Sequence, residues 1–182
     1  IEEGAENTSI LASIAGPFAV LLVPVVGIAA WQLAAAAITG FIAKENVVGT
    51  IATVYAITNF IDPDELELIG SGNAVATAMG ITKVAALAYL MFNLYTPPCF
   101  AALGAMNSEM QSGKWLFAGI CLQLATGFTV GFLVYQIGTL ITTGSLGAGF
   151  VGGLIAVLVF AAVIVTLIVR ANRAIDTEYQ LD

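Results

Sequence analysis

Lys44 and Glu45 are the first residues whose types could do chemistry, because they stand inside the predominantly apolar stretch of residues 29–57. Charged side chains at membrane depth are costly, and they usually face the interior of a helix bundle, often along an ion path. Neighbouring helical residues point about 100° apart, so the two charges do not form a simple helical pair. We expect one to line a cavity and the other to reach the interface. The alternative is that both sit at a membrane edge, after a short or tilted helix.

Cys99 is the second candidate, since it follows two prolines and precedes the small-residue segment 100–106. This arrangement predicts a thiol beside a helix N-terminus, where the positive end of the helix dipole favours the thiolate. A thiolate is a soft ligand that suits a transition metal. The alternative is that Cys99 is a small buried hydrophobic residue, as cysteine often is, and we interpret Cys121 in that way.

Glu109 lies at the predicted end of the helix that Cys99 begins. Ten residues span roughly 15 Å along a helix, so Cys99 and Glu109 cannot bind one ion together unless the helix bends. Two interpretations stay open. Glu109 either belongs to the cytoplasmic mouth of an ion path or is an interfacial carboxylate near Lys114.

The composition indicates which kind of fold must position these residues. Of 182 residues, 59% are hydrophobic and 9% are charged, whereas about 25% are charged in soluble domains. Residues 115–143 and 146–169 contain no Asp, Glu, Lys or Arg, and each run exceeds the roughly 20 residues with which a helix crosses the hydrocarbon core. The sequence therefore predicts an all-α, polytopic helical membrane protein with about four spans. An additional N-terminal segment, broken by Gly16-Pro17 and Pro24, is predicted to be interfacial or spanning.

Two apolar stretches, residues 29–57 and 82–110, are each interrupted, at residues 44–46 and 96–98 respectively. Pro97 and Pro98 lack an amide N–H and push the residues before them out of helical geometry. Inside a bilayer, backbone groups freed in this way need protein or a water-filled cavity to satisfy them. Transporters build substrate sites at such broken helices. A plain proline kink is the alternative.

The last part of the chain is predicted to hold two uninterrupted spans separated by a turn at residues 138–147. The glycine pairs 127/131 and 149/153 have the small-xxx-small spacing, which predicts close packing of these two spans. Lys114, Arg170 and Arg173 flank them and, by the positive-inside rule, place the C-terminus in the cytoplasm. The acidic loop 59–73 then faces outward.

These observations predict three regions. Residues 1–28 form an acidic tail and a short Pro-broken apolar helix. Residues 29–110 form a membrane region with two interrupted helices and an outward acidic loop, and residues 111–182 form two spans and a short cytoplasmic tail. The chain has no histidine and no G-x-x-x-x-G-K-[ST] segment, so we predict that it is not an enzyme and holds no tightly bound cofactor. Its five Lys and Arg residues form no basic patch, which argues against a nucleic-acid partner.

Three stretches together resemble the membrane region of ferrous iron transport protein B. The first runs from Trp31 to Tyr55 and contains Ala-Lys-Glu-Asn-Val-Val-Gly-Thr at residues 43–50. The second runs from Ala88 through Thr-Pro-Pro-Cys at residues 96–99, and the third runs from Gly104 through Gln136. Their order and spacing match the C-terminal half of that family and cover most of the chain.

The resemblance implies that the chain is the membrane permease part of a ferrous iron uptake transporter in the bacterial inner membrane, with Fe(II) as the transported ion. Cys99 corresponds to the Pro-Cys cysteine of the second of two gate-type repeats, so residues 29–110 are expected to be a gate repeat. The implied path or gate residues are Lys44, Glu45, Asn46, Pro98, Cys99 and Glu109, and the implied metal ligands are Cys99, Glu45 and Glu109.

The family also implies partners. A GTP-binding domain and a first gate repeat precede this region there, so we expect them as partners in the same or a separate chain, with GTP acting only through that domain. Membrane lipid and a homo-oligomer are the other partners to expect. Two departures from the family pattern stand out: Ser108 occupies an expected basic position before Glu109, and residues 20–26 lack an expected basic residue.

Two other functions remain open. A gate-type transporter of a nucleoside or another small solute would use hydrogen-bonding side chains such as Asn93, Gln123 and Gln136. A non-transporting membrane assembly subunit would use its broken helices only for packing.

Overall fold

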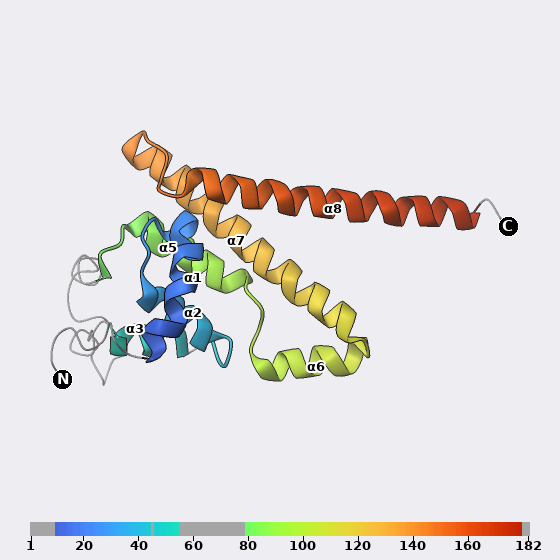
Figure 1. The fold of residues 1–182 in the computed structure, drawn as a ribbon, viewed down its shortest axis with the longest axis horizontal. Coiled ribbons are helices and arrows are strands. Elements are labelled where there is room, and N and C mark those ends of the chain that lie inside the picture. Colours follow the sequence, from blue (N-terminus) through green and yellow to red (C-terminus); the bar gives the residue numbers. More distant parts are fainter. Residues whose placement is uncertain (1–9, 45, 55–78, 180–182) are drawn as a thin grey trace.

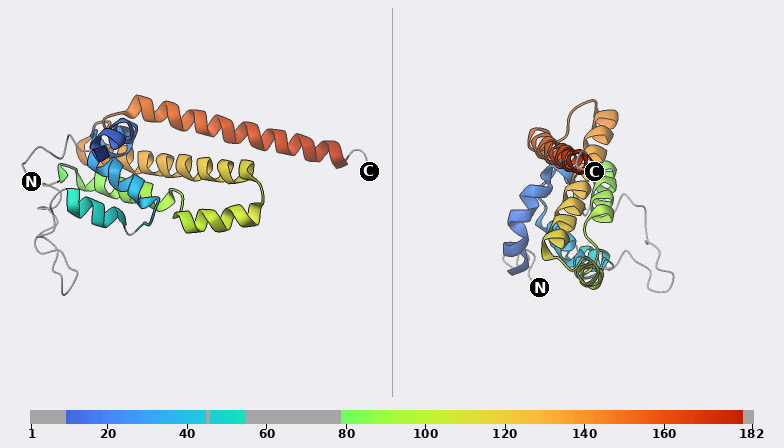
Figure 2. Two further views of the ribbon diagram at one scale, coloured as in Figure 1. Left: turned by 60° about the horizontal axis from the view of Figure 1, so that its bottom comes forward. Right: turned by 90° about the vertical axis from the view of Figure 1, so that its right-hand side faces the viewer.

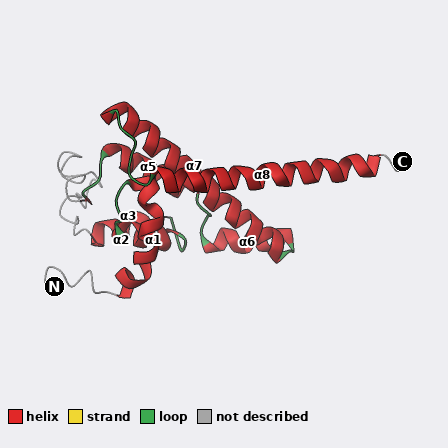
Figure 3. Cartoon of the chain, turned by 45° about the horizontal axis from the view of Figure 1, so that its top comes forward, coloured by secondary structure: helices red, strands yellow, loops and turns green. Residues whose placement is uncertain are grey.

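The computed structural model describes residues 10–44, 46–54 and 79–179, and within them every regular element is a helix (Figure 3). The helices are α1 (Ile10–Val26), α2 (Trp31–Gly40), α3 (Asn46–Val54), α5 (Lys83–Tyr95), α6 (Phe100–Met110), α7 (Gly113–Thr143) and α8 (Phe150–Tyr179). The all-α prediction is confirmed. The acidic loop predicted at residues 59–73 lies outside the described residues.

Three helical stretches are long and apolar enough to cross a membrane. They are Lys83–Met110, which contains α5 and α6, and the single helices Gly113–Thr143 and Phe150–Arg170. α1 and α2 pass the same test only as a pair, and they are bent by 98° at their connection. The described residues therefore hold three such spans, or four if the bent pair is one, which agrees with the polytopic membrane class predicted from the sequence.

α1 continues through both of its prolines, although the sequence predicted breaks there. Pro17 and Pro24 both lie inside Ile10–Val26. The buried residues of the helix recur at helical spacing, so one continuous face packs against the neighbouring helices and holds the helix together; they include Ala12, Ala15, Ala19, Leu22 and Val25. The chain turns instead at Gly27, whose φ of 86° is readily adopted only by glycine.

The core lies where α1, α2, α5 and α7 meet (Figures 1 and 2). Its centre is built from small side chains: Ala34, Ala35, Ala36 and Ala88 are completely buried. Small residues let helix backbones approach closely, which is how helices associate where lipid removes the ordinary hydrophobic driving force. The interrupted helices are thereby held against the uninterrupted helix α7.

Glycines of α7 face α5, a partner that the sequence did not identify. A Cβ on Gly127 would lie 3.0 Å from the carbonyl oxygen of Phe92, and one on Gly131 would lie 3.2 Å from the carbonyl oxygen of Ala88. The pair was expected to bring the last two spans together, but it sets the approach of α7 to α5 instead. The other predicted glycine pair agrees in part with the expectation, since Gly153 of α8 lies against a phenylalanine ring of α7 but Gly149 lies against Pro24 of α1.

The predicted turn between the last two spans begins later than expected. Gly138 lies inside α7, where a Cβ would be 2.5 Å from Cγ1 of Val84 in α5, so this glycine serves packing. α7 ends at Thr143 and is followed by Gly144, whose left-handed φ of 69° provides the usual glycine cap of a helix C-terminus. The turn therefore follows residue 143 rather than residue 138.

α8 leaves the bundle soon after this turn and extends away from it (Figure 1). Near its start, the ring of Phe150 stacks on that of Phe132 in α7, with 6.1 Å between ring centroids. Beyond that contact, most of its apolar surface is exposed, and only 6% of its candidate span is buried. Such a surface suits a hydrocarbon environment.

Candidate functional site

The first interruption is a short, hydrogen-bonded connection between α2 and α3. The amide of Ile42 donates to the carbonyl of Thr39 at 2.9 Å, and the amide of Val47 donates to the carbonyl of Lys44 at 3.2 Å. Gly40 permits the close contact between the end of α2 and the start of α3, because a Cβ there would lie 2.5 Å from Cγ2 of Val47. Lys44 therefore lies on a tight turn between α2 and α3, and the backbone hydrogen bonds of this turn fix its position.

The second interruption separates α5 from α6. Thr96 follows α5 with extended backbone angles (φ −69°, ψ 160°), and Cys99 precedes α6 with similar angles (φ −60°, ψ 163°). In a continuous helix the amide of residue 97 would donate to the carbonyl of Asn93, but Pro97 has no amide hydrogen. The interruption therefore leaves the carbonyl of Asn93 without its helical donor.

Lys44 supplies a donor to that carbonyl and joins the two interruptions. Its ammonium Nζ donates hydrogen bonds to the carbonyl oxygen of Asn93, to the carbonyl oxygen of Thr96 at 3.0 Å and to the hydroxyl oxygen of Thr96 at 3.1 Å. The hydroxyl of Thr96 in turn donates to the carbonyl of Asn93 at 2.8 Å. A positive charge at the C-terminal end of α5 also complements the negative end of the helix dipole.

Neighbouring contacts hold α5 in place for this interaction. The buried hydroxyl of Tyr89 donates to the carbonyl of Leu33 in α2 at 2.7 Å, and the side-chain amide of Asn93 donates to the carbonyl of Tyr89 at 2.9 Å. On the other side, Gly127 of α7 lies against the end of α5, where a Cβ would be 3.2 Å from the amide nitrogen of Thr96. The end of α5 is therefore enclosed by Lys44 on one side and by α7 on the other.

The other predicted site residues are spread over the chain. Pro98 and Cys99 lie at the second interruption, and Cys99 is a half-buried free thiol at the start of α6. Asn46 is the exposed first residue of α3. Glu109 is exposed near the far end of α6, so the helix separates it from Cys99 as expected. Glu45 lies outside the described residues.

The metal-ligand prediction stays a prediction. Within the described part of the chain, no three or more Cys, Asp or Glu side chains gather where they could hold a metal ion. The structure brings Lys44 to Asn93 and Thr96, but it does not bring Cys99 to Glu109.

Sequence reasoning missed the roles of Asn93, Thr96 and Gly127. Asn93 precedes Pro97 by four residues, so its carbonyl loses a helical partner, and this signal could have been found in the sequence. The identity of the replacement donor could not, because Lys44 lies 49 residues earlier in the chain. Nothing local to Gly127 indicates that it faces the end of α5.

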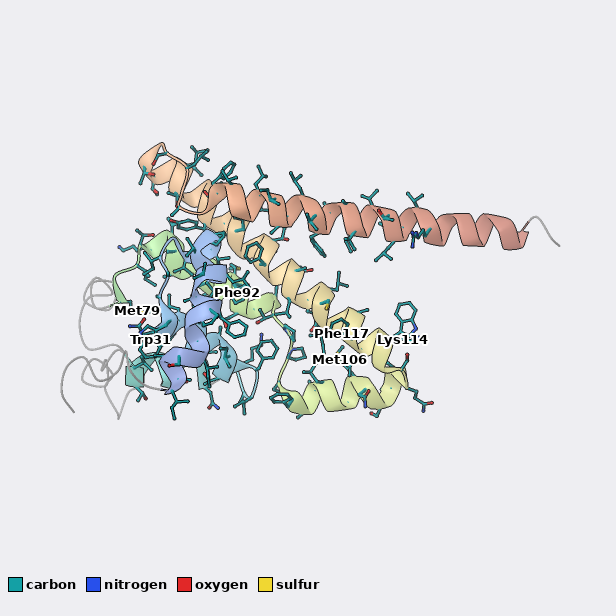
Figure 4. All side chains as sticks on the ribbon, in the orientation of Figure 1. Trp31, Met79, Phe92, Met106, Lys114 and Phe117 are labelled. Carbon is teal, nitrogen blue, oxygen red and sulfur yellow. The ribbon has the colours of Figure 1, made fainter. Side chains whose placement is uncertain are left out.

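An apolar pocket of about 260 Å³ adjoins the second interruption. It lies between α1, α2, α5 and α7, and Phe92, labelled on α5 in Figure 4, lines it. Among the described residues that line it, Thr96 is polar and the others are apolar. Cys121 lies elsewhere, in an apolar groove between α7 and α8.

Comparison with known proteins matches the chain to the Gate family, described as nucleoside recognition, over residues 3–113. The chain is 30% identical to the Fe(2+) transporter FeoB of Staphylococcus aureus (strain COL) over 125 residues, which cover 69% of the chain and 17% of that protein. It is 28% identical to the Fe(2+) transporter FeoB of Salmonella typhi over 191 residues, which cover 81% of the chain and 24% of that protein. No solved structure matches the chain.

The chain therefore spans less than a quarter of the length of these relatives. The matched family region contains Lys44 and both interruptions, which the structure joins. On this evidence the chain belongs to the Gate family and is similar to the gate-domain region of FeoB-type transporters.

Proposed function

We propose that this chain is the membrane permease part of a ferrous iron uptake transporter. The observation that carries the proposal is the contact between the two interruptions, where Lys44 replaces the backbone donor that Pro97 lacks. Many transporters build their substrate and ion sites within the membrane from such discontinuous helices. The similarity to proteins named as Fe(2+) transporters supports Fe(II) as the transported ion.

Cys99 is the proposed sulfur ligand on the path. Its place at the start of α6, directly after the interruption, puts a thiol beside the positive end of a helix dipole. Fe(II) accepts mixed sulfur and oxygen ligands, so Glu45 and Glu109 remain the proposed carboxylates. Lys44 is the proposed charge partner or gate. Asn46, in the motif of Lys44, and Pro98, beside Cys99, are further proposed path residues.

The proposal extends to partners and location. A GTPase domain and a first gate repeat, in the same or a separate chain, would supply GTP-dependent control. The bacterial inner membrane is the proposed location, with the C-terminus in the cytoplasm, because Lys114 and Arg170 flank the apolar runs 115–143 and 146–169. Membrane lipid would cover α8, and a homo-oligomer is also proposed.

The description of the matched family favours a second candidate, transport of a nucleoside or a similar solute. Such a solute needs several hydrogen-bonding side chains in its pocket. The pocket beside the interruption is lined by apolar residues and Thr96, which suits a nucleoside poorly. That pocket lends the solute little support, and the similarity to proteins named as Fe(2+) transporters keeps Fe(II) as the leading proposal.

The test is uptake of radioactive Fe(II) by bacterial cells that lack their own transporter and express the chain with the GTPase domain and first gate repeat. Cys99→Ser should abolish most uptake at an unchanged level of protein in the membrane. Cys121→Ser is the matched control, because Cys121 lies in the separate groove between α7 and α8, and it should transport normally. Wild-type uptake by Cys99→Ser would remove Cys99 from the path. Uptake of a nucleoside but not Fe(II) by the unmodified protein would replace the proposal with the second candidate.

A further inference from the structure

Three oxygen atoms at the end of α5 converge on one positive charge. The Nζ of Lys44 contacts the carbonyl oxygen of Asn93, the carbonyl oxygen of Thr96 at 3.0 Å and the hydroxyl oxygen of Thr96 at 3.1 Å. Because the hydroxyl of Thr96 gives its hydrogen to the carbonyl of Asn93, its oxygen faces the ammonium as an acceptor. All three atoms therefore present lone pairs to the same point.

These oxygens are ligands for a hard cation. Carbonyl and hydroxyl oxygens prefer hard ions, and unwound carbonyls at the C-terminal ends of broken helices coordinate Na⁺ in transporters. The three ligands carry no formal charge, and the helix end adds about half a negative charge. This partial negative charge balances a monovalent cation better than a divalent one, and the ammonium that binds here is itself monovalent.

We propose that the end of α5 is a binding site for a hard monovalent cation, Na⁺ or K⁺, and that Lys44 occupies this site as a tethered cation. The ammonium and a free ion exclude one another, because both need the same three oxygens. Lys44 lies on the turn between α2 and α3 and reaches the site through its flexible four-carbon stem. The site can therefore exchange its occupant without unfolding α5. The proposal concerns only Lys44 and the oxygen atoms at the end of α5, and it does not depend on which substrate is transported.

The experiment measures the melting temperature of the purified full chain in detergent with NaCl, KCl or choline chloride at equal ionic strength. Choline is too large for a site of three converging oxygens. The unmodified protein should melt at the same temperature in all three salts, because Lys44 fills the site. Lys44→Met should melt on the order of 5 °C lower in choline chloride, since the carbonyls of a helix end lose a charged donor. NaCl or KCl should restore most of this loss, and the effect should saturate with ion concentration.

Lys83→Met is the matched control, because Lys83 is the exposed first residue of the same helix. It should show the same melting temperature in the three salts. Adding Thr96→Val to Lys44→Met should weaken the response to Na⁺ or K⁺, since it removes one of the three ligands. A Lys44→Met protein that melts equally in all three salts would overturn the proposal. So would an unmodified protein that Na⁺ or K⁺ stabilises as strongly as the variant.

Lys44→Gln takes the place of Lys44→Met if the latter does not fold in any salt. Its side-chain amide retains an N–H donor for the helix end but carries no charge, so the ion response should persist with smaller amplitude. An equal melting temperature in the three salts would again overturn the proposal. Neither result bears on iron uptake, which the Cys99→Ser experiment tests separately.

Discussion

Gly127→Ala should destabilise the protein, because the added methyl group would clash with the C-terminal end of α5. The added Cβ would lie 3.0 Å from the carbonyl oxygen of Phe92 and 3.2 Å from the amide nitrogen of Thr96. Both neighbours are backbone atoms, so no side-chain rotation can relieve the contact. α7 and α5 must instead move apart at the interruption that Lys44 bridges.

Gly119→Ala in the same helix provides the comparison. The nearest atom to its Cβ would be Cε of Met106, at an ordinary contact distance of 3.7 Å. Met106 lies on α6 and faces α7 (Figure 4), and its flexible side chain can adjust. Both substitutions gain the same helix propensity, up to about 1 kcal/mol, so the difference between them isolates the cost of overpacking.

Overpacking of this kind costs about 1–3 kcal/mol. Each kcal/mol lowers the melting temperature of a chain of this size by about 2–4 °C. Gly127→Ala should therefore melt about 2–12 °C below Gly119→Ala when both purified chains are heated in the same detergent. Equal melting temperatures would refute the reasoning, because α7 could then not be holding the end of α5 at the distance described.

Two further predictions use the same melting assay. Gly27→Ala should strongly lower the melting temperature, because it places a side chain at φ 86° and against a buried tyrosine of α7. Gly16→Ala is the control, since its Cβ would meet nothing within 4 Å, and it should leave the melting temperature unchanged or raise it. A similar loss in both variants would contradict the prediction. Tyr89→Phe should cost about 1 kcal/mol, because it removes the buried hydrogen bond to the carbonyl of Leu33. Tyr95→Phe, at an exposed position of the same helix, should cost nothing measurable, and an equal effect of the two would argue against the bond.

Several features followed from the sequence because their causes are local. Apolar runs longer than a bilayer is thick predicted the membrane class, and three described stretches meet that criterion. The interruption at Pro97 and Pro98 was predictable because proline has no amide hydrogen. Cys99 at the start of α6 and Glu109 near its end follow from the same boundary.

Local rules also failed where tertiary packing outweighed them. α1 continues through Pro17 and Pro24 because its buried face packs along the whole helix. Gly138 was predicted to begin a turn, but it remains helical because its missing side chain makes room for Val84. A glycine can serve a turn or a close helix contact, and only the neighbouring helix decides between the two.

The candidate site shows the same division most clearly. The sequence alone identified a charged interruption at Lys44 and a helix break at Pro97, and it indicated that the break would free backbone groups. Only the tertiary structure decided that the two meet, through hydrogen bonds between residues 49 and 52 positions apart. A missing amide hydrogen is a property of one residue and can be read locally. The donor that replaces it depends on how four helices pack, and no spacing within the sequence specifies that.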